Sequence, residues 1–308
     1  MYSSIERSDK YKESLLAFIF CEYGIEANNL TPARRGFYGE TWRLETANTS
    51  YFLKLVYPAV HKPVYERSFA LVEHLCKHGI DFISRIVKTS DDRLFSQFDG
   101  AVLGVFDWID GENIETDETK VPEYQMLAKV YSVPPVGVSI PLEGFSSHNA
   151  DRFYKEWDTL QDRQLRLLFE KNRIKLEYRA VRLKHFSTLC RDETSSFVIT
   201  HGDAGGNLIK NGNSYHIVDW DNAILAPPER DAWVMCSREW ARDAFHNALC
   251  NNGIDYTLRP ERLAYYCYDF FFFYLNAFLD ACAQADTIEE YLNGWITESF
   301  KFADEIPG

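Results

Sequence analysis

The sequence predicts an α+β fold of two lobes, the first built on an antiparallel sheet and the second mainly helical. The chain has 308 residues, and chains of this length usually divide into more than one compact part. Short strand-like runs separated by turn residues fill much of 35–106, whereas later residues follow a mainly helical spacing. We therefore expect an N-terminal lobe over 1–106, a hinge over 107–111 and a helical lobe over 112–308.

Turn and stop residues delimit the elements expected in the first lobe. Gly24 and Gly79 each follow an apolar pattern with helical spacing, as residues that end a helix do. Asp99-Gly100 is a dipeptide typical of two-residue β-hairpin turns. The expected order is a helix over 8–23, strands over 35–44 (around a glycine turn) and 51–56, a helix over 64–78, and strands over 94–98 and 101–106.

Helical spacing prevails in the second lobe. Residues 132–147, with three prolines and two glycines, are expected to form a loop. The most apolar stretch, 270–279, is about half as long as a bilayer crossing requires and contains Asn276, so we expect a buried helix there. Helices are expected over 123–131, 157–189, 228–250 and from 259 onward.

Composition and charge narrow the function classes. Hydrophobic residues make up 46% of the chain and aromatic residues 15%, which is typical of globular proteins. The 33 basic and 46 acidic residues give a net charge of −13, which argues against a nucleic-acid partner, because phosphate backbones attract basic patches. An acidic surface suits a cationic ligand, and it serves solubility equally well.

The cysteines and the N-terminal residues indicate a cellular compartment. Seven cysteines are scattered without a C-x-x-C pair, so neither a disulfide framework nor a zinc site is expected. The polar, charged residues 1–10 do not resemble a signal peptide. We expect a cytoplasmic protein with free thiols and no membrane association.

Two short segments in the C-terminal half combine acidic and amide side chains. Residues 201–207 read His-Gly-Asp-Ala-Gly-Gly-Asn, and residues 217–221 read Ile-Val-Asp-Trp-Asp. Strand-like residues between them flank Asn211-Gly212, a two-residue hairpin signal, so Asn207 and Asp219 are expected to come close together. His-Gly-Asp alone would indicate no more than a capped turn. Together, the segments offer a carboxylate for a hydroxyl proton and oxygen ligands for Mg²⁺, which phosphoryl transfer from a nucleotide requires.

At these residues the chain resembles the aminoglycoside phosphotransferase family, whose members are relatives of the protein kinases. The resemblance implies a protein-kinase-like two-lobe fold and transfer of a γ-phosphoryl group from ATP or GTP to a small-molecule hydroxyl. It implies that Asp203 is the catalytic base and that His201 orients the loop around it. It also implies that Asn207 and Asp219 hold Mg²⁺.

One departure from the family pattern lies in the spacing of this loop. The usual pattern places the Asn five residues after the base, whereas Asn207 follows Asp203 by four. Gly205 and Gly206 could absorb the missing residue, because glycine reaches backbone angles closed to other residues.

Lys54 lies in an apolar, strand-like run over 51–56. A lysine among apolar side chains needs a reason, because a buried ammonium is costly unless it is paired. The resemblance implies that Lys54 contacts the α- and β-phosphates and pairs with an acid on the following helix, Glu66 or, as second candidate, Glu73. The alternative is an edge-strand lysine that reaches solvent.

Two further segments would complete a nucleotide site by the same resemblance. A glycine turn would cover the phosphates with backbone N–H groups, although it lacks the full Gly-x-Gly-x-x-Gly pattern and suits a plain hairpin equally well. The hinge would bind the purine edge through its backbone. The residues concerned are Gly36, Phe37, Tyr38, Gly39 and Thr41 in the turn, and Phe106, Asp107 and Ile109 in the hinge.

Two acids near the motif have structural interpretations. Asp231 follows a Pro-Pro pair, and the resemblance implies that it braces the catalytic loop; an acid in the first turn after Pro228 also suits the helix dipole. Asp221 could join Asp219 at the metal or cap the turn before Pro227, and capping is the favoured role.

The acceptor is expected to bind in the helical lobe. Carboxylates would hold a cationic amino sugar, and aromatic rings would stack on it. Aromatic residues at helical spacing are also typical of a core, and exposed acids are typical of a solvated face, so this alternative stays open. The candidate residues are Glu239, Trp240, Asp243 and Asp269.

The sequence thus predicts a nucleotide- and Mg²⁺-dependent phosphotransferase, with an aminoglycoside or related amino sugar as first candidate acceptor and antibiotic resistance as one role that would follow. Choline, homoserine and sugars are alternative acceptors within the same family. A catalytically silent nucleotide-binding module is the other alternative. The four-residue spacing favours that module, and the joint presence of the lysine, the base and the metal ligands disfavours it.

Overall fold

The computed structural model of the chain describes residues 7–33, 39–191, 196–294 and 297–307. The chain packs into two compact units, the first comprising 1–141 and 201–224 and the second 142–200 and 225–308. This division differs from the expected lobes, because residues 112–141 and 201–224 belong to the first unit. Residues 112–113 pair with 209–210 as strands. The N–H of Ile217 donates to the Phe82 carbonyl (3.0 Å), which connects the later segment to the rest of the first unit.

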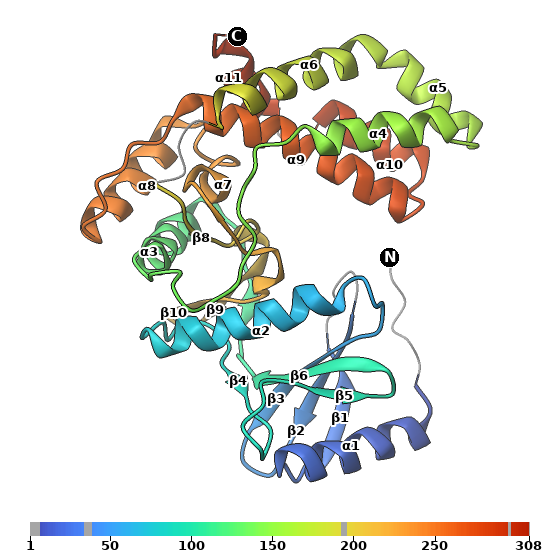
Figure 1. Cartoon of the computed structure of the whole chain (residues 1–308), viewed down its shortest axis with the longest axis vertical. Helices are drawn as coiled ribbons and strands as arrows, with labels where there is room; N and C mark the ends of the chain where they lie inside the picture. The colour runs from blue at the N-terminus through green and yellow to red at the C-terminus, as the bar shows by residue number, and fades with distance from the viewer. Residues whose placement is uncertain (1–6, 34–38, 192–195, 295–296, 308) are drawn as a thin grey trace. The chain divides into compact units, whose positions relative to one another are not determined.

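An antiparallel sheet forms the centre of the first unit (Figure 1). Its strand order is β1-β2-β3-β6-β4, and β5 also pairs with β6. The hairpin predicted at Asp99-Gly100 joins β5 to β6, and the φ angles of 47° and 77° at these residues suit a two-residue turn. The strands are β1 (Asn29–Pro32), β2 (Glu40–Glu45), β3 (Ser50–Val56), β4 (Ile86–Val87), β5 (Ser96–Phe98) and β6 (Ala101–Asp107).

Two of these strands, β1 and β4, were not predicted. β4 has two residues, and β1 buries only Leu30 of its four, so neither shows the alternation that marks a strand. The expected strand over 35–44 is observed from Glu40, and residues 34–38 lie outside the described part of the chain.

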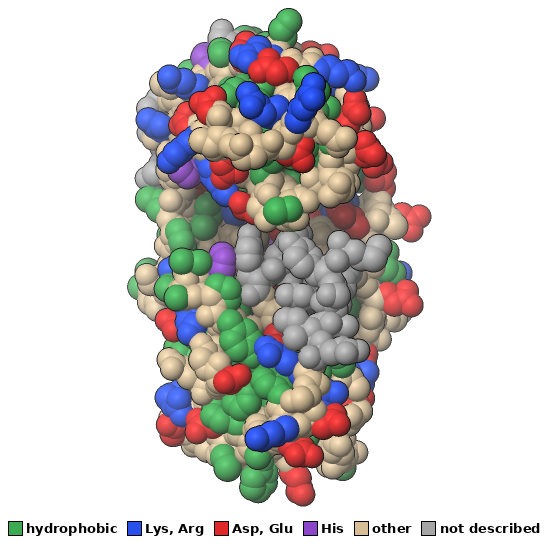
Figure 2. Space-filling view, turned by 90° about the vertical axis from the view of Figure 1, so that its right-hand side faces the viewer, with side chains coloured by type: hydrophobic (Ala, Val, Ile, Leu, Met, Phe, Trp, Pro, Cys, Tyr) green, Lys and Arg blue, Asp and Glu red, His purple; other side chains and the backbone are tan. Residues whose placement is uncertain are grey.

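Two properties of the exterior bear on the predictions. Within the described ranges, no helix combines the length and the apolarity that crossing a bilayer demands. On the face shown in Figure 2, acidic side chains are interspersed with lysines and arginines rather than gathered in one patch.

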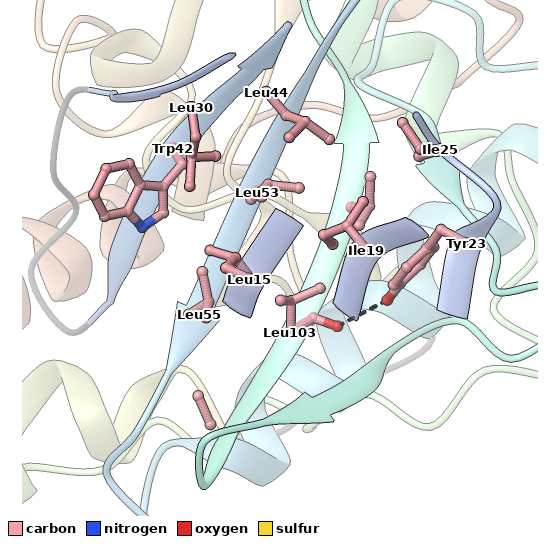
Figure 3. Close-up of a cluster of buried hydrophobic side chains, with 12 residues drawn as sticks. Leu15, Ile19, Tyr23, Ile25, Leu30, Trp42, Leu44, Leu53, Leu55 and Leu103 are labelled. Atoms are coloured by element: carbon pink, nitrogen blue, oxygen red, sulfur yellow. Dashed lines mark hydrogen bonds between the residues drawn. The ribbon is translucent and has the colours of Figure 1, made fainter. Parts of the chain in front are cut away.

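Helix α1 (Asp9–Tyr23) covers one face of the sheet and closes its main apolar core. The Ser8 side chain accepts the N–H of Tyr11, and Gly24 ends the helix with a φ of 66°, so the predicted N-terminal helix is confirmed. The Tyr23 hydroxyl donates to the Leu103 carbonyl (3.2 Å; Figure 3). The core comprises Leu15, Ile19, Tyr23, Ile25, Leu30, Trp42, Leu44, Leu53, Leu55, Ala101, Leu103 and Val105.

Helix α2 (Lys62–Lys77) packs on the other face of the sheet. The ring of Phe69 lies against Gly104 and Phe106 of β6, and the centroids of the two rings are 5.4 Å apart. Gly104 is directly opposite Lys54 in the β3–β6 register, so the α2 face of the sheet also carries Lys54. The helix begins two residues before its predicted start and ends, as predicted, before Gly79.

A side chain at position 104 would collide with the aromatic rings of this face. A Cβ on Gly104 would lie 2.7 Å from Cζ of Phe69 and 3.1 Å from Cε2 of Phe106. We expect Gly104→Ala to lower the free energy of unfolding by about 1–3 kcal/mol, the usual cost of overpacking a core. Chemical denaturation measures the change. Gly144→Ala is the control, because a Cβ there meets no atom within 4 Å, and equal stability of the two variants would contradict this account.

A second, smaller sheet completes the first unit with α3 (Lys120–Tyr131). Its strands are β10 (Ser214–Ile217), β9 (Leu208–Asn211) and β7 (Glu112–Asn113), in that order. The predicted β9–β10 hairpin is present, but its turn residues are Gly212-Asn213 rather than Asn211-Gly212, because Asn211 pairs with Ser214. Gly212 has a φ of 57°, and this positive angle favours glycine at the first turn position.

The second unit is mainly helical, as predicted, with α9 (Pro260–Asp280) at its centre. Helices α4, α6 and α11 pack against α9, whose Phe271, Phe272 and Leu275 are buried. Phe273 is 40% exposed, so the stretch over 270–279 is helical as expected but only partly buried. Asp162 caps α5 and divides the stretch predicted as helical over 157–189. The other elements are α4 (His148–Thr159), α5 (Arg163–Lys171), α6 (Arg173–Leu189), α7 (Glu229–Ala232), α8 (Glu239–Asn251), α10 (Ala285–Gly294), α11 (Thr297–Glu305) and the paired strands β8 (Val198–Thr200) and β11 (Ile224–Ala226).

Candidate active site

Lys54 is buried on β3 and has two carboxylates as partners. Its Nζ lies 2.8 Å from Oδ1 of Asp219 and 2.5 Å from Oδ2 of Asp221, and its side chain is 9% exposed. The ring centroid of Tyr65 on α2 lies 4.6 Å from the same nitrogen. Burial on its own lowers the pKa of Lys54, but Asp221 and Asp219 outweigh it and raise that pKa above its ordinary value. The ammonium is therefore charged at every physiological pH.

The predicted ion pair between Lys54 and an acid of α2 is not formed. In the part of the chain that the structure describes, the acids paired with Lys54 are Asp219 and Asp221. Glu66 forms no ion pair with any described residue, and Glu73 pairs with two other lysines at 3.1 Å each. The predicted partner is therefore wrong, because two acids from the turn after β10 already compensate the lysine.

The turn after β10 has an uncommon backbone. Asp219 has a φ of 67° and a ψ of 65°, in the left-handed region that residues other than glycine seldom occupy. The 3₁₀ turn Trp220–Asn222 follows, and Trp220 is buried, which holds the turn in place. The side chains of Asp219 and Asp221 are 41% and 15% exposed. The Asp219 carboxylate is therefore accessible to solvent as well as bonded to Lys54.

Asp221 does not take the capping role favoured for it. Its carboxylate bonds Lys54 and accepts no hydrogen bond from the backbone of the described residues of the turn. Burial raises the pKa of Asp221 to about 6, against the lowering effect of Lys54 and with a further contribution from Asp219. Burial also acts to raise the pKa of Asp219, but Lys54 outweighs it and lowers that pKa. Asp219 is therefore the acid that stays ionised throughout the physiological range.

His201 links the 201–207 loop to the turn after β10. The side chain is fully buried, and its ring centroid lies 4.6 Å from that of Trp220. Nδ1 accepts the N–H of Asp203 (3.2 Å), so the proton resides on Nε2, which donates to the Val218 carbonyl (2.9 Å). Both ring nitrogens of His201 are therefore bonded to backbone groups, one in the loop and one directly after β10.

Asp203 and Asn207 are joined directly. Residues Gly205–Asn207 form a 3₁₀ turn, and the N–H of Asn207 donates to the Ala204 carbonyl (3.0 Å). Nδ2 of Asn207 donates to the carbonyl oxygen of Asp203 (2.8 Å) and to Oδ2 of its carboxylate (3.1 Å). This tight turn accommodates the four-residue spacing. Asp203 is exposed, so its carboxylate is accessible to a hydroxyl group.

Asn207 lies beside the turn that carries Asp219. The N–H of Val218 donates to the Asn207 carbonyl (3.1 Å) and brings that turn against the loop. Because Nδ2 of Asn207 is turned to Asp203, its Oδ1 is the side-chain atom left for a cation. Amide and carboxylate oxygens are ligands that Mg²⁺ prefers. Among the described residues no three His, Cys, Asp or Glu side chains group as a metal site.

The described end of the glycine turn lies next to the strand of Lys54. Gly36, Phe37 and Tyr38 are outside the described residues. A Cβ on Gly39 would lie 3.0 Å from the Leu55 carbonyl oxygen, so the backbone passes close to β3. Thr41 is buried and lies opposite Lys54 in the β2–β3 register.

The three hinge residues differ in which backbone groups stay accessible. The N–H of Asp107 donates to the Arg85 carbonyl (2.9 Å), and its own carbonyl accepts the Ser84 hydroxyl (2.6 Å). Phe106 is buried and paired on both sides within the sheet. Among the described residues, none bonds the backbone of Ile109. Of these three residues, Ile109 is thus the one whose backbone is left open by the described part of the chain.

The residues predicted to bind the acceptor fall into two groups in the second unit. Glu239, Trp240 and Asp243 are exposed on α8. Asp269 lies half-buried on α9, where Nδ2 of Asn149 donates to its Oδ1 (2.9 Å). Within the described ranges no hydrogen bond or ion pair joins the two groups.

The surroundings of Asp269 include an acid that sequence patterning did not single out. Glu143 accepts hydrogen bonds from the Tyr266 hydroxyl (3.1 Å) and the Phe145 N–H (2.8 Å). It lies in a proline-containing loop, where no periodic pattern marks a functional side chain. Burial raises the pKa of Asp269 to about 7, against the hydrogen bond from Asn149, and the charge of Glu143 adds to the shift. Tyr265 and Tyr266 are core residues, 2% and 1% exposed.

Asp231 occupies the position that the Pro-Pro pattern predicts. It lies in the first turn of α7, and Pro228 directly precedes this helix. An acid there is favoured by the helix dipole.

Asp269→Asn tests how the raised pKa of the Asp269 carboxyl affects the stability of the fold. Because the folded-state pKa of Asp269 lies above its ordinary value, the protonated acid stabilises the fold at low pH, and this contribution is lost as pH rises from about 4 towards 7. Asparagine keeps the acceptor for Asn149 and cannot ionise. We therefore expect the variant to gain about 1–3 kcal/mol relative to the unaltered protein between about pH 5 and pH 8. Urea unfolding measures the difference, with exposed Asp158→Asn as control, and a pH-independent difference would contradict it.

The fold of the chain is that of solved kinase-like phosphotransferases. A spectinomycin phosphotransferase, solved with ADP and spectinomycin, matches with a TM-score of 0.72 at 18% identity, over 96% of this chain and 94% of that one. A putative aminoglycoside phosphotransferase from Ralstonia eutropha JMP134 matches with a TM-score of 0.63 at 14% identity, over 96% and 99%. A choline kinase from Cryptosporidium parvum Iowa II matches with a TM-score of 0.59 at 11% identity, over 90% and 89%. The predicted protein-kinase-like fold is confirmed.

Residues 29–266 match the phosphotransferase enzyme family (APH), and the chain belongs to this family. The predicted class, a phosphotransferase that acts on hydroxyl groups of small molecules, is thereby confirmed. No curated protein matches the sequence significantly.

Proposed function

We propose that the protein transfers the γ-phosphoryl group of ATP or GTP to a hydroxyl of a cationic small molecule, with Mg²⁺ as the metal. The grouping of four side chains in one unit carries this proposal. Lys54 bonds Asp219, Asn207 bonds Asp203, and the backbone of Asn207 bonds the turn of Asp219. Solved structures of similar fold with ADP, AMP or AMP-PNP support the nucleotide.

The nucleotide would lie along the α2 face of the sheet. Lys54 supplies a fixed positive charge for the α- and β-phosphates, and Ile109 offers free backbone groups for the purine edge. The turn from Gly36 to Thr41 would cover the phosphates. Glu66 lies on α2 and does not pair with Lys54 among the described residues, so any role at the nucleotide would not pass through the lysine.

Each polar residue of the 201–207 loop would have a separate role in the transfer. Asp203 would accept a hydrogen bond from the acceptor hydroxyl and take its proton as the new phosphorus–oxygen bond forms. Asn207 holds that carboxylate through Oδ2, and His201 fixes the backbone on which both stand. Mg²⁺ held by Asn207 and Asp219 would neutralise phosphate charge. Asp231 would brace the loop, as the family resemblance implies.

The acceptor is proposed to carry positive charge. Asp269 and Glu143 place two acids close together in the second unit, and Glu239, Trp240 and Asp243 offer further acidic and aromatic side chains. Relatives of similar fold were solved with spectinomycin or are described as an amicoumacin kinase and a choline kinase. Amino sugars are therefore the first candidates, and choline, homoserine and plain sugars the alternatives. The cytoplasmic location stays a prediction from the cysteine pattern.

Mg²⁺-dependent release of ADP or GDP tests the proposal. The purified protein is assayed with aminoglycosides, spectinomycin, macrolides, choline, homoserine and simple sugars, with Asp203→Asn as the blank. Turnover that depends on one acceptor and disappears in the blank supports the phosphotransferase and identifies its acceptor class. Nucleotide binding without turnover on any acceptor would favour the silent module instead.

A further inference from the structure

A polar network at the start of α3 surrounds a buried lysine. The side chain of Lys120 is 4% exposed, and its Nζ lies 3.0 Å from Oε1 of Glu115 and 2.9 Å from Oε2 of Glu123. Burial on its own lowers the pKa of Lys120, but the two acids outweigh it and raise that pKa. Lys120 is thus a fixed cation held between two carboxylates. α3 itself lies beside β10 (Figure 1).

This network lies in direct contact with the loop over 201–207. A Cβ on Gly205 would lie 2.5 Å from Nζ of Lys120 and 2.5 Å from Oε1 of Glu115. The φ angle of Gly205 is not positive, so the backbone itself would admit another residue. A Cβ there would have to displace the ends of the Lys120 and Glu115 side chains. At the next residue, Nδ2 of Asn113 donates to the Gly206 carbonyl (2.8 Å). Two consecutive loop residues therefore have partners from residues 113–120.

The residues between Asp203 and Asn207 offer no polar side chain that could fix the backbone of the loop. Only Ala204, Gly205 and Gly206 separate Asp203 from Asn207, and none of the three has a polar side chain. Two adjacent glycines also leave the backbone many conformations. The hydrogen bonds from Asn207 to Asp203 set the separation of these two side chains, and contacts from outside the loop can restrict the glycine backbone between them.

We propose that Lys120, Glu115 and Asn113 are positioning residues that hold the shortened loop, so that Asp203 and Asn207 keep the separation their roles require. This inference rests on the proposed function, and it explains how a loop one residue shorter than the family pattern still brings base and metal ligand together. In this proposal none of the three is a ligand of the substrate or of the metal. Their effect passes through the backbone of Gly205 and Gly206.

Two single variants test the proposal, each with a matched control. Gly205→Ala keeps every charge and displaces the Lys120–Glu115 pair; Gly294→Ala is its control, because a Cβ at Gly294 meets no atom within 4 Å. Glu115→Gln weakens the contact with Lys120; exposed Glu118→Gln is its control. The probe is Mn²⁺ bound to the protein–ADP complex, followed by electron paramagnetic resonance, together with kcat, the nucleotide KM and the melting temperature.

We expect Mn²⁺ to bind about tenfold more weakly in both test variants, the scale found for residues that support metal ligands. The kcat falls about tenfold to a hundredfold, as for small misplacements of reacting groups, while the nucleotide KM stays within about twofold. The double variant should be no worse than the stronger single variant, because both substitutions act on one contact.

Mn²⁺ binding and kcat equal to those of the controls would overturn the positioning role. So would losses that only track the melting temperature, since those indicate a structural brace. If the unaltered protein binds no Mn²⁺ with ADP, the proposed function fails together with this inference. If it binds the ion and the variants do so equally well, the inference alone fails.

Discussion

Asp203→Asn is expected to lower kcat by about 10²- to 10⁴-fold, the range for loss of a general base. The substitution preserves the size of the side chain and removes the oxygen that takes the hydroxyl proton. Nucleotide affinity should change little, because Asp203 contacts neither Lys54 nor the described hinge residues in the hydrogen bonds and ion pairs of the structure. Acceptor-dependent ADP release gives kcat, and calorimetry gives the nucleotide dissociation constant.

Exposed Asp158→Asn is the matched control for the charge that this substitution removes. It should leave both quantities unchanged. Transfer that survives undiminished in Asp203→Asn would remove Asp203 from the role of catalytic base.

Lys54→Met is expected to lower kcat/KM for the nucleotide by about 10²- to 10³-fold, as loss of one preorganised cation or donor does. It should also destabilise the protein, because Asp219 and Asp221 would be left side by side without a cation. The expected loss is about 1–3 kcal/mol, less than for a fully buried ion pair, because Asp219 also faces solvent. Steady-state kinetics and urea unfolding measure the two effects, with exposed Lys77→Met as control.

A double variant separates the two roles of Lys54. Lys54→Met with Asp221→Asn removes the repulsion between the acids, so most of the stability should return, but turnover should not. Recovery of turnover together with stability would show that Lys54 serves the fold and not the phosphates. A Lys54→Met variant that binds nucleotide normally would remove the lysine from the phosphate site.

Local chemistry explains what could be predicted from the sequence. Gly24 and Gly79 end α1 and α2, and Asp99-Gly100 forms the β5–β6 hairpin, because these residues adopt positive φ angles within a few residues of the pattern they end. The proximity of the His-Gly-Asp and Asp-Trp-Asp segments could also be predicted from local sequence. Both lie within 201–221, and one hairpin brings them together.

Long-range contacts explain what could not be predicted. The partners of Lys54 lie 165 and 167 residues away, and no sequence pattern distinguishes Asp221 as a partner for the lysine rather than a cap. The same holds for the Lys120 network, whose contact with Gly205 joins a helix start to a loop in another part of the chain. Strands β1 and β4 could not be predicted, because each is too short to show an alternation of apolar and polar side chains.

The discontinuity of the first unit bears on how the protein is made. β7 can pair with β9 only after all of 142–200 has been synthesised, because the chain enters the second unit between the two strands. At about 5–20 residues per second, the ribosome needs roughly 5–20 seconds to pass from one strand to the other. Over that interval the nascent chain presents an unpaired strand edge and a buried-lysine network that lacks the loop it later supports. The small sheet of the first unit is therefore expected to form late, after the ribosome has released most of the second unit's first segment.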